Sequence, residues 1–148
     1  MAQSLAKIYV HFIYSTKNRV PFLASPSIRK EVYAYLATAF KAYESPAVLI
    51  GGTEDHIHAL CMLSRNFTVA KIIGEVKRNS SKWLKTKGPK FARFQWQAGY
   101  GAFSVSHSNV AHVRQYIAGQ EEHHRKRTFQ DEFRALLRKH EIEFDEQY

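Results

Sequence analysis

Two short apolar runs separated by a turn are the feature that most constrains how this chain can fold. The runs are AVLI at residues 47–50 and IHALCML at residues 57–63. Pro46 prevents a helix from continuing into the first run. The intervening stretch from Gly51 to Asp55 is rich in turn-forming residues, so the pattern predicts an antiparallel hairpin.

A strand and a helix are predicted on each side of this hairpin. Residues 5–14 and 99–106 are rich in β-branched and aromatic residues, as strands are. Ser25 and Thr68 are suited to cap two helices whose apolar residues recur at helical spacing. The order strand, helix, strand, strand, helix, strand predicts an α+β fold, the ferredoxin-like split βαβ with a four-stranded antiparallel sheet.

The C-terminal part is predicted to be helical. Ser108 or Asn109 begins a helix that runs to about His124, and Thr128 with Asp131 marks the start of a last, short helix. No repeat or linker interrupts the sequence. We therefore expect one domain over residues 1–148, with the sheet and two helices at about 5–106 and the helical extension at about 109–140.

The positive charge of the chain is concentrated in one region. The net charge is +9, and residues 65–93 contain nine basic residues against one acid, whereas the rest has 13 basic and 12 acidic residues. Such a patch favours a nucleic-acid partner, although a solvated helix face gives the same pattern. The candidate phosphate contacts are Lys77, Arg78, Lys82 and Lys85. Candidates for stacking on unpaired bases are Trp83, Phe94 and Trp96, of which Trp83 also lies on an apolar helix stripe.

The cellular setting is predicted from what the sequence contains. Cys61 is the single cysteine, so no internal disulfide is expected. The apolar runs are far shorter than a membrane span, and the N-terminal residues do not resemble a signal peptide. We expect a cytoplasmic protein that is associated with the nucleoid when bound to DNA and does not bind a membrane.

The histidine pair His56 and His58 is the first candidate for chemistry. Alternate residues of a strand point to the same face, so both imidazoles lie on one face and Ile57 on the other. With both predicted core helices on one side of the sheet, this polar face is expected to be open. Two imidazoles at this spacing can reach one metal ion, but a polar strand face also carries such pairs by chance, and a third ligand is needed.

The predicted third helix supplies further polar residues. His112, Tyr116 and Gln120 are spaced four residues apart and therefore share a stripe beside the apolar stripe of that helix. Taken alone, this tyrosine is more typical of a half-buried packing residue than of a nucleophile. The glutamine alone is typical of a surface.

Three motifs occur together in a characteristic order: TEDHIHAL at residues 53–60, Trp96 followed by GYGAFSVS, and Tyr116 spaced four residues before Gln120. In this respect the chain resembles the single-tyrosine HUH transposases, which move insertion sequences as single-stranded DNA, and their relatives associated with repetitive extragenic palindromes. The resemblance extends from the first strand to about Phe133.

The resemblance implies a metal-dependent DNA strand transferase. His56, His58 and Gln120 would bind a divalent metal, Mg²⁺ or Mn²⁺, and Tyr116 would attack DNA to give a 5′-phosphotyrosine. It also implies single-stranded or hairpin DNA as a partner, and a homodimer in which the tyrosine helix of one subunit can complete the site of the other.

Three alternatives stay open at this point. The chain is either a mobile-element transposase or a domesticated relative acting on palindromic repeats. A non-catalytic nucleic-acid-binding module is the second alternative. The third is a metal-dependent phosphoesterase that uses water as its nucleophile. The target DNA sequence and the group that activates the tyrosine are not evident from the residues.

Overall fold

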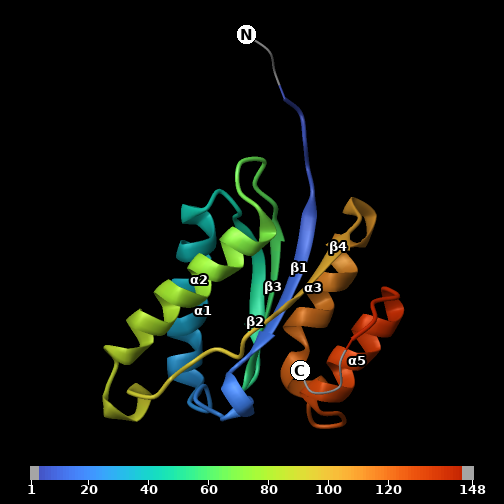
Figure 1. The fold of residues 1–148 in the computed structure, drawn as a ribbon. Coiled ribbons are helices and arrows are strands. Elements are labelled where there is room, and N and C mark those ends of the chain that lie inside the picture. The colour runs from blue at the N-terminus through green and yellow to red at the C-terminus, as the bar shows by residue number, and fades with distance from the viewer. Residues whose placement is uncertain (1–3, 145–148) are drawn as a thin grey trace.

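A computed structural model describes residues 4–144 and contains one four-stranded sheet (Figure 1). The strands are β1 (Tyr9–Ser15), β2 (Ala47–Gly52), β3 (His56–Met62) and β4 (Gly101–Val105). They are arranged in the order β2-β3-β1-β4, and all neighbouring pairs are antiparallel. This is the predicted split βαβ arrangement. The two ends of the predicted domain, residues 1–3 and 145–148, lie outside the described residues.

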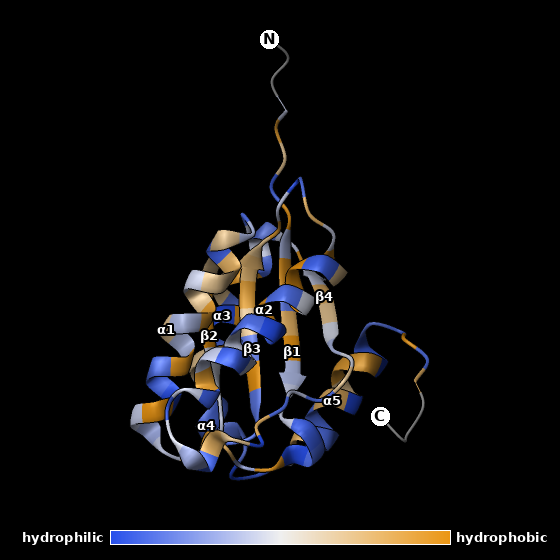
Figure 2. Cartoon of the chain, turned by 60° about the vertical axis from the view of Figure 1, so that its left-hand side comes forward, coloured by the Kyte–Doolittle hydropathy of each residue, from blue (hydrophilic) through white to orange (hydrophobic). Residues whose placement is uncertain are grey.

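Two long helices, α1 (Pro26–Ala42) and α2 (Val69–Lys85), cover one face of the sheet. Both begin where a cap was predicted: the hydroxyl of Ser25 accepts a hydrogen bond from the backbone of Ile28, and that of Thr68 from Lys71. Figure 2 shows hydrophobic residues along β1 and β3 and many hydrophilic residues on the ribbon of α2. The main core lies between this pair of helices and the sheet.

The other face of the sheet is covered as well, which corrects the expectation of an open face. It carries α3 (Val110–Ala118), α4 (Gln120–His123) and α5 (Phe129–Lys139), which together form the predicted C-terminal helical extension. The single helix predicted up to His124 is divided at Gly119, where the backbone leaves the helical conformation. Polar residues of the sheet on this side are therefore enclosed.

Helix α3 lies unusually close to β2. An added Cβ atom at Gly51 would be 2.9 Å from the backbone oxygen of Ile117, which is tighter than such contacts normally are. Ile117 is buried in a small apolar cluster with Tyr9 and Leu60. The missing side chain at Gly51 thus lets the tyrosine-bearing helix approach its own sheet.

Helix α5 lies over β1 and β4 through a second apolar cluster. Phe129 and Leu137 of α5 pack with Ile13 and Phe103 of the sheet. The helix begins at Thr128, whose hydroxyl accepts a hydrogen bond from the backbone of Asp131, as the sequence predicted. None of the helices within residues 4–144 has the length and apolar character needed to cross a bilayer.

Candidate metal and tyrosine site

His56 and His58 of β3 point to the same face, as the strand period predicted, and their ring centroids are 5.2 Å apart. Ile57 and Ala59 between and after them point into the core under α1 and α2. Neither histidine is exposed to solvent, because α3 to α5 cover them. The pair is therefore an enclosed site rather than part of an open sheet face.

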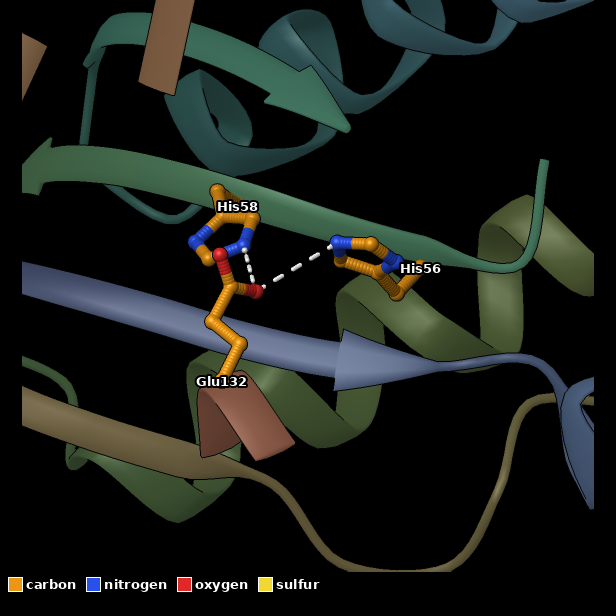
Figure 3. A group of neighbouring side chains, drawn as sticks. All are labelled: His56, His58 and Glu132. Atoms are coloured by element: carbon orange, nitrogen blue, oxygen red, sulfur yellow. Dashed lines mark hydrogen bonds and ion pairs between the residues drawn. The ribbon is translucent and has the colours of Figure 1, made fainter. Parts of the chain in front are cut away.

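The carboxylate of Glu132 comes from α5 to complete a group of three (Figure 3). Its Oε1 atom is 2.9 Å from Nε2 of His58 and 3.6 Å from Nε2 of His56, and the residue is fully buried. Two imidazoles and a carboxylate, with ligand atoms within 4.8 Å of one another, are a donor set that suits a divalent cation. Glu132 was not predicted, because an acid in the first turn of a helix normally interacts with the helix dipole.

The neighbours of His56 fix the orientation of its ring. Nδ1 is 2.8 Å from a carboxylate oxygen of Asp55 and must carry a hydrogen, because that oxygen only accepts. Nε2 faces two more oxygens, Oε1 of Gln120 at 3.0 Å and Oε1 of Glu132. A cation placed among Nε2 and these two oxygens would contact all three atoms. An acid holding the outer nitrogen of a metal-binding histidine is a common arrangement.

The second histidine has a partner that the sequence did not identify. Nδ1 of His58 lies 2.7 Å from Nε2 of His11, a buried residue of β1. Burial lowers the pKa of His58 to about 4 and that of His11 to about 3. Both rings are therefore neutral near pH 7. Nothing in the sequence distinguishes His11 from an ordinary strand residue, because it comes close to His58 only through the pairing of β1 with β3.

Glu132 is held in its charged form despite its burial. Burial by itself would raise the pKa of this carboxyl, but hydrogen bonds from His124, His58 and Tyr116 hold it well below its usual range. His124 lies 3.2 Å from the carboxylate through Nε2. The site thus contains one permanent negative charge that is available to neutralise part of a divalent cation.

Tyr116 of α3 lies at the same place, and its hydroxyl donates a hydrogen bond to Oε2 of Glu132. The tyrosine and histidine rings are close, with 5.7 Å between the centroids of Tyr116 and His58. Burial, followed by the bond to Glu132, raises the pKa of this phenol well above its usual value. The structure therefore brings the predicted nucleophile beside the histidine pair of its own chain, in the protonated form.

Gln120 is also brought to the site, at the start of α4 directly after the break at Gly119. Its Oε1 faces His56, and its Nε2 donates to Glu132 over 3.0 Å. It is almost completely buried. The structure thus places all four predicted site residues together, whereas the metal-binding role of Gln120 stays a prediction.

A cavity of about 250 Å³ opens beside Tyr116. Its wall includes Tyr116, Glu132 and His11, and two cationic side chains, Arg127 and Lys139, also line it. An anionic group that entered here would meet the tyrosine and positive charge together.

The predicted DNA contacts on α2 have different environments. Lys77 donates to the backbone oxygens of Gln97 and Gly99, and burial lowers its pKa to about 8. Arg78 pairs with Glu75, whereas Lys82 and Lys85 are exposed. Arg78 is exposed too, so Lys77 alone of the four is partly buried.

The three predicted stacking residues are buried or already pack against other side chains of the protein. Phe94 is fully buried, so its predicted contact with unpaired bases is wrong. Trp83 stacks on Tyr35, with ring centroids 4.6 Å apart, which confirms its packing role. Trp96 donates to the hydroxyl of Ser80 and packs against Tyr14.

Comparison with known proteins gives one family and two related structures. Residues 4–120 match the family model described as "Transposase IS200 like". A candidate transposase from Deinococcus radiodurans R1 has 19% identity over 81% of this chain and 95% of its own, with a TM-score of 0.62. The REP-associated tyrosine transposase, solved bound to a REP hairpin, has 12% identity over 84% of this chain and 73% of its own, with a TM-score of 0.61. No curated protein matches the sequence.

The two structural likenesses agree with the fold described above. The family match ends at Gln120, so it includes the histidine pair and Tyr116 but not α5. Glu132 therefore lies outside the matched residues.

Proposed function

The chain belongs to the IS200-like transposase family, and from this premise we propose that it cleaves and rejoins single-stranded DNA through a covalent bond to Tyr116. One observation supports this more than any other. The hydroxyl of Tyr116 and the imidazoles of His56 and His58 converge on the same buried carboxylate. Packing alone does not require a phenol, two imidazoles and a carboxylate to meet in this way.

The donor set fits a divalent cation, which His56, His58 and Glu132 would hold with Gln120 beside them. Imidazole ligands suit Mn²⁺ at least as well as Mg²⁺, which prefers oxygen. When bound, such an ion supplies Lewis-acid stabilisation of the phosphate charge. Asp55 and Thr53 orient His56, and His11 orients His58.

The strand-transfer step needs no other reactant. The Tyr116 oxygen would bond to the phosphorus, and the bond from phosphorus to the 3′ oxygen would break. Oε2 of Glu132, which accepts the hydrogen of the hydroxyl, would take the phenolic proton, and this proton would pass to the departing 3′ oxygen, which ends as a hydroxyl. Because the phosphodiester is kept as a phosphotyrosine, attack by a second 3′-hydroxyl would reverse the step and join two strands.

Hairpin DNA is the partner that we propose. The REP-associated relative was solved with such a hairpin, and this chain has the positive charge that a DNA ligand requires. Lys82 and Lys85 are exposed on α2 and would contact phosphates, with Arg78 and Lys77 beside them. The scissile phosphate would enter the cavity next to Tyr116, toward Arg127 and Lys139.

The covalent bond provides the test. The protein is incubated with labelled single-stranded hairpin DNA and Mn²⁺ or Mg²⁺, and the products are separated in SDS. We expect an adduct that survives SDS and that disappears in Tyr116→Phe and His56→Ala. Tyr35→Phe removes a hydroxyl that bonds to the backbone of α2 on the opposite side of the sheet, and it should keep the adduct.

The remaining outcomes identify the alternatives. Cleavage that persists in Tyr116→Phe without any adduct would sink the transferase proposal and favour a water-dependent phosphoesterase. Binding of the hairpin without cleavage would favour a non-catalytic binding module. Cleavage restricted to palindromic repeats would favour a domesticated relative over a mobile-element enzyme.

A further inference from the structure

A second cavity, of about 440 Å³, lies on the other side of α5 from the tyrosine cavity. Three segments form most of its walls: the end of β1 with the turn after it, residues 97–100 before β4, and α5. Its size lies in the range typical of small-ligand sites. It is separate from the cavity beside Tyr116, with which it shares no lining residue.

The cavity exists because the sheet is interrupted at this edge. Gly101 pairs with Ile13, and the next link between the two segments is the bridge from Trp96 to Thr16. Gln97 still donates its backbone N–H to Ser15, so residues 98–100, yellow in Figure 1, are the ones that bulge away from β1 before β4 begins. The bulge leaves a hollow that α5 closes from the other side.

The lining has the composition of a nucleotide-binding site. Tyr100, Phe129 and Phe133 offer aromatic rings, and Arg19 and Arg134 offer positive charge. Amide side chains complete the polar part, and none of the described residues that line the cavity is acidic. Aromatic rings bind unpaired bases by stacking, and arginine binds phosphate.

The turn that carries Arg19 is strained in a way that favours a functional role. Asn18 and Arg19 both have φ near +55°, a conformation that residues other than glycine rarely adopt. The turn is held by a hydrogen bond from the backbone of Asn18 to the side chain of Gln97, and by one from Thr16 to Val20. These contacts hold the backbone of Arg19, an exposed residue, beside the cavity that it lines.

The cavity is only one side chain away from the candidate metal ligands. Phe129 lines it, and the centroid of this ring is 4.7 Å from that of His56. A DNA strand with a phosphate at the site would therefore have a neighbouring nucleotide within reach of the cavity. We propose that this cavity binds one unpaired nucleotide of the strand that flanks the scissile phosphate, with its base against Tyr100 and Phe133 and its phosphate on Arg19. This inference rests on the proposed function.

The test places 5-iododeoxyuridine at each unpaired position in turn of a single-stranded hairpin oligonucleotide. Binding and photocrosslinking are carried out in the Tyr116→Phe protein, so that no adduct interferes. We expect one position to crosslink within the peptide that contains Tyr100. Tyr100→Ala should remove this crosslink and weaken binding about tenfold, the usual effect of removing a ring on which a base stacks.

Arg19→Ala provides a second readout. It should lower the slope of log affinity against log salt by about 0.7, the value expected for one phosphate of a single strand. The matched control is Lys30→Ala, which removes an exposed charge from α1 and should leave the slope unchanged.

The outcomes separate this inference from the proposed function. Unchanged affinity and salt slope in both cavity variants, with no crosslink at Tyr100, would overturn the nucleotide site even if the wild-type protein forms the adduct. A crosslink at Tyr100 in a protein that forms no adduct would leave the nucleotide site standing and reject the transferase. Failure of the Tyr116→Phe protein to bind the oligonucleotide would reject the cavity proposal.

Discussion

The carboxylate of Glu132 has no contact with solvent, yet it hydrogen-bonds with His58, Tyr116 and Gln120. A buried charge of this kind is costly unless it is paired, and removing its charge should weaken any cation bound there. We expect Glu132→Gln to lower the affinity for Mn²⁺ about tenfold or more, because metal sites lose at least this much when a supporting group is removed. Isothermal titration calorimetry measures the Mn²⁺ affinity of both proteins.

Asp131→Asn is the matched control for this change. It removes the neighbouring charge of α5, where the side chain is exposed and pairs with Arg134 of the same helix. Its Mn²⁺ affinity should equal that of the wild type. Equal affinities for all three proteins would exclude Glu132 as a ligand.

The two buried imidazoles His11 and His58 should make stability depend on pH. Their folded pKa values, about 3 and about 4, lie below the ordinary value of 6.5, so the unfolded chain binds more protons than the folded chain between these limits. Stability is then fully present above pH 6.5 and is lost as the pH falls, by up to ~1.4 kcal/mol per pH unit for each imidazole. Urea unfolding in EDTA at pH 7, 6 and 5 should show this decline.

His11→Gln tests the contribution of one imidazole. Glutamine can still form a hydrogen bond with His58 but does not titrate, so the decline between pH 7 and 5 should become shallower. An unfolding midpoint that is constant over this range in the wild-type protein would contradict the prediction.

At the scale of elements, the position of α3 depends on Gly51. A methyl group there would meet the backbone of Ile117, which cannot move without moving the helix that carries Tyr116. We expect Gly51→Ala to cost about 1–3 kcal/mol of stability, the usual penalty of overpacking, and to reduce adduct formation more than the stability loss explains. Chemical unfolding and the adduct assay measure the two effects.

Gly74→Ala is the matched control, since nothing lies within 4 Å of an added Cβ atom in the exposed middle of α2. Alanine is the better helix former, so this variant should gain roughly 0.5–1 kcal/mol and keep its activity. If Gly51→Ala behaves like Gly74→Ala, close docking of α3 is not needed.

The core elements could be predicted because their signals are local. Ser25, Thr68 and Thr128 mark helix starts by their own hydroxyls, and the alternation of His56 and His58 fixes their common face. The covered second face could not be predicted in this way. Whether α3 and α5 fold back on the sheet depends on contacts between distant residues, such as Ile117 with Gly51 and Phe129 with Ile13. Glu132 was not predicted for the same reason, because its contact with the histidine pair depends on how α5 folds back on the sheet.

For the molecule as a whole, the charge of α2 should govern the salt dependence of DNA binding. Replacing both Lys82 and Lys85 by alanine should lower the slope of log affinity against log salt by roughly 0.7 for each single-strand phosphate that these lysines neutralise. The control is the double change Lys30→Ala and Lys41→Ala, which removes two exposed charges from α1. Equal slopes for the two double variants would show that α2 is not the DNA-binding surface.

The candidate site residues, Tyr116 included, all lie together within one chain. Tyr116 donates to Glu132 of the same chain, and α3 docks on its own β2 at Gly51. If this arrangement is the functional one, we expect no adduct when Tyr116→Phe and His56→Ala proteins are mixed, even if the protein forms the homodimer implied by its resemblance, because each tyrosine would act at the histidine pair of its own chain.

Chains that carry tags of different size make this experiment decisive. If the tyrosine acted in trans, DNA would become attached to the His56→Ala chain, which keeps Tyr116 and would use the intact histidines of its partner. An adduct at that chain's mass would therefore contradict a site completed within one subunit. A mixture of wild-type and His56→Ala chains serves as the control: in the arrangement described here, only the wild-type chain should be labelled, because the histidine pair that acts on Tyr116 belongs to the same polypeptide.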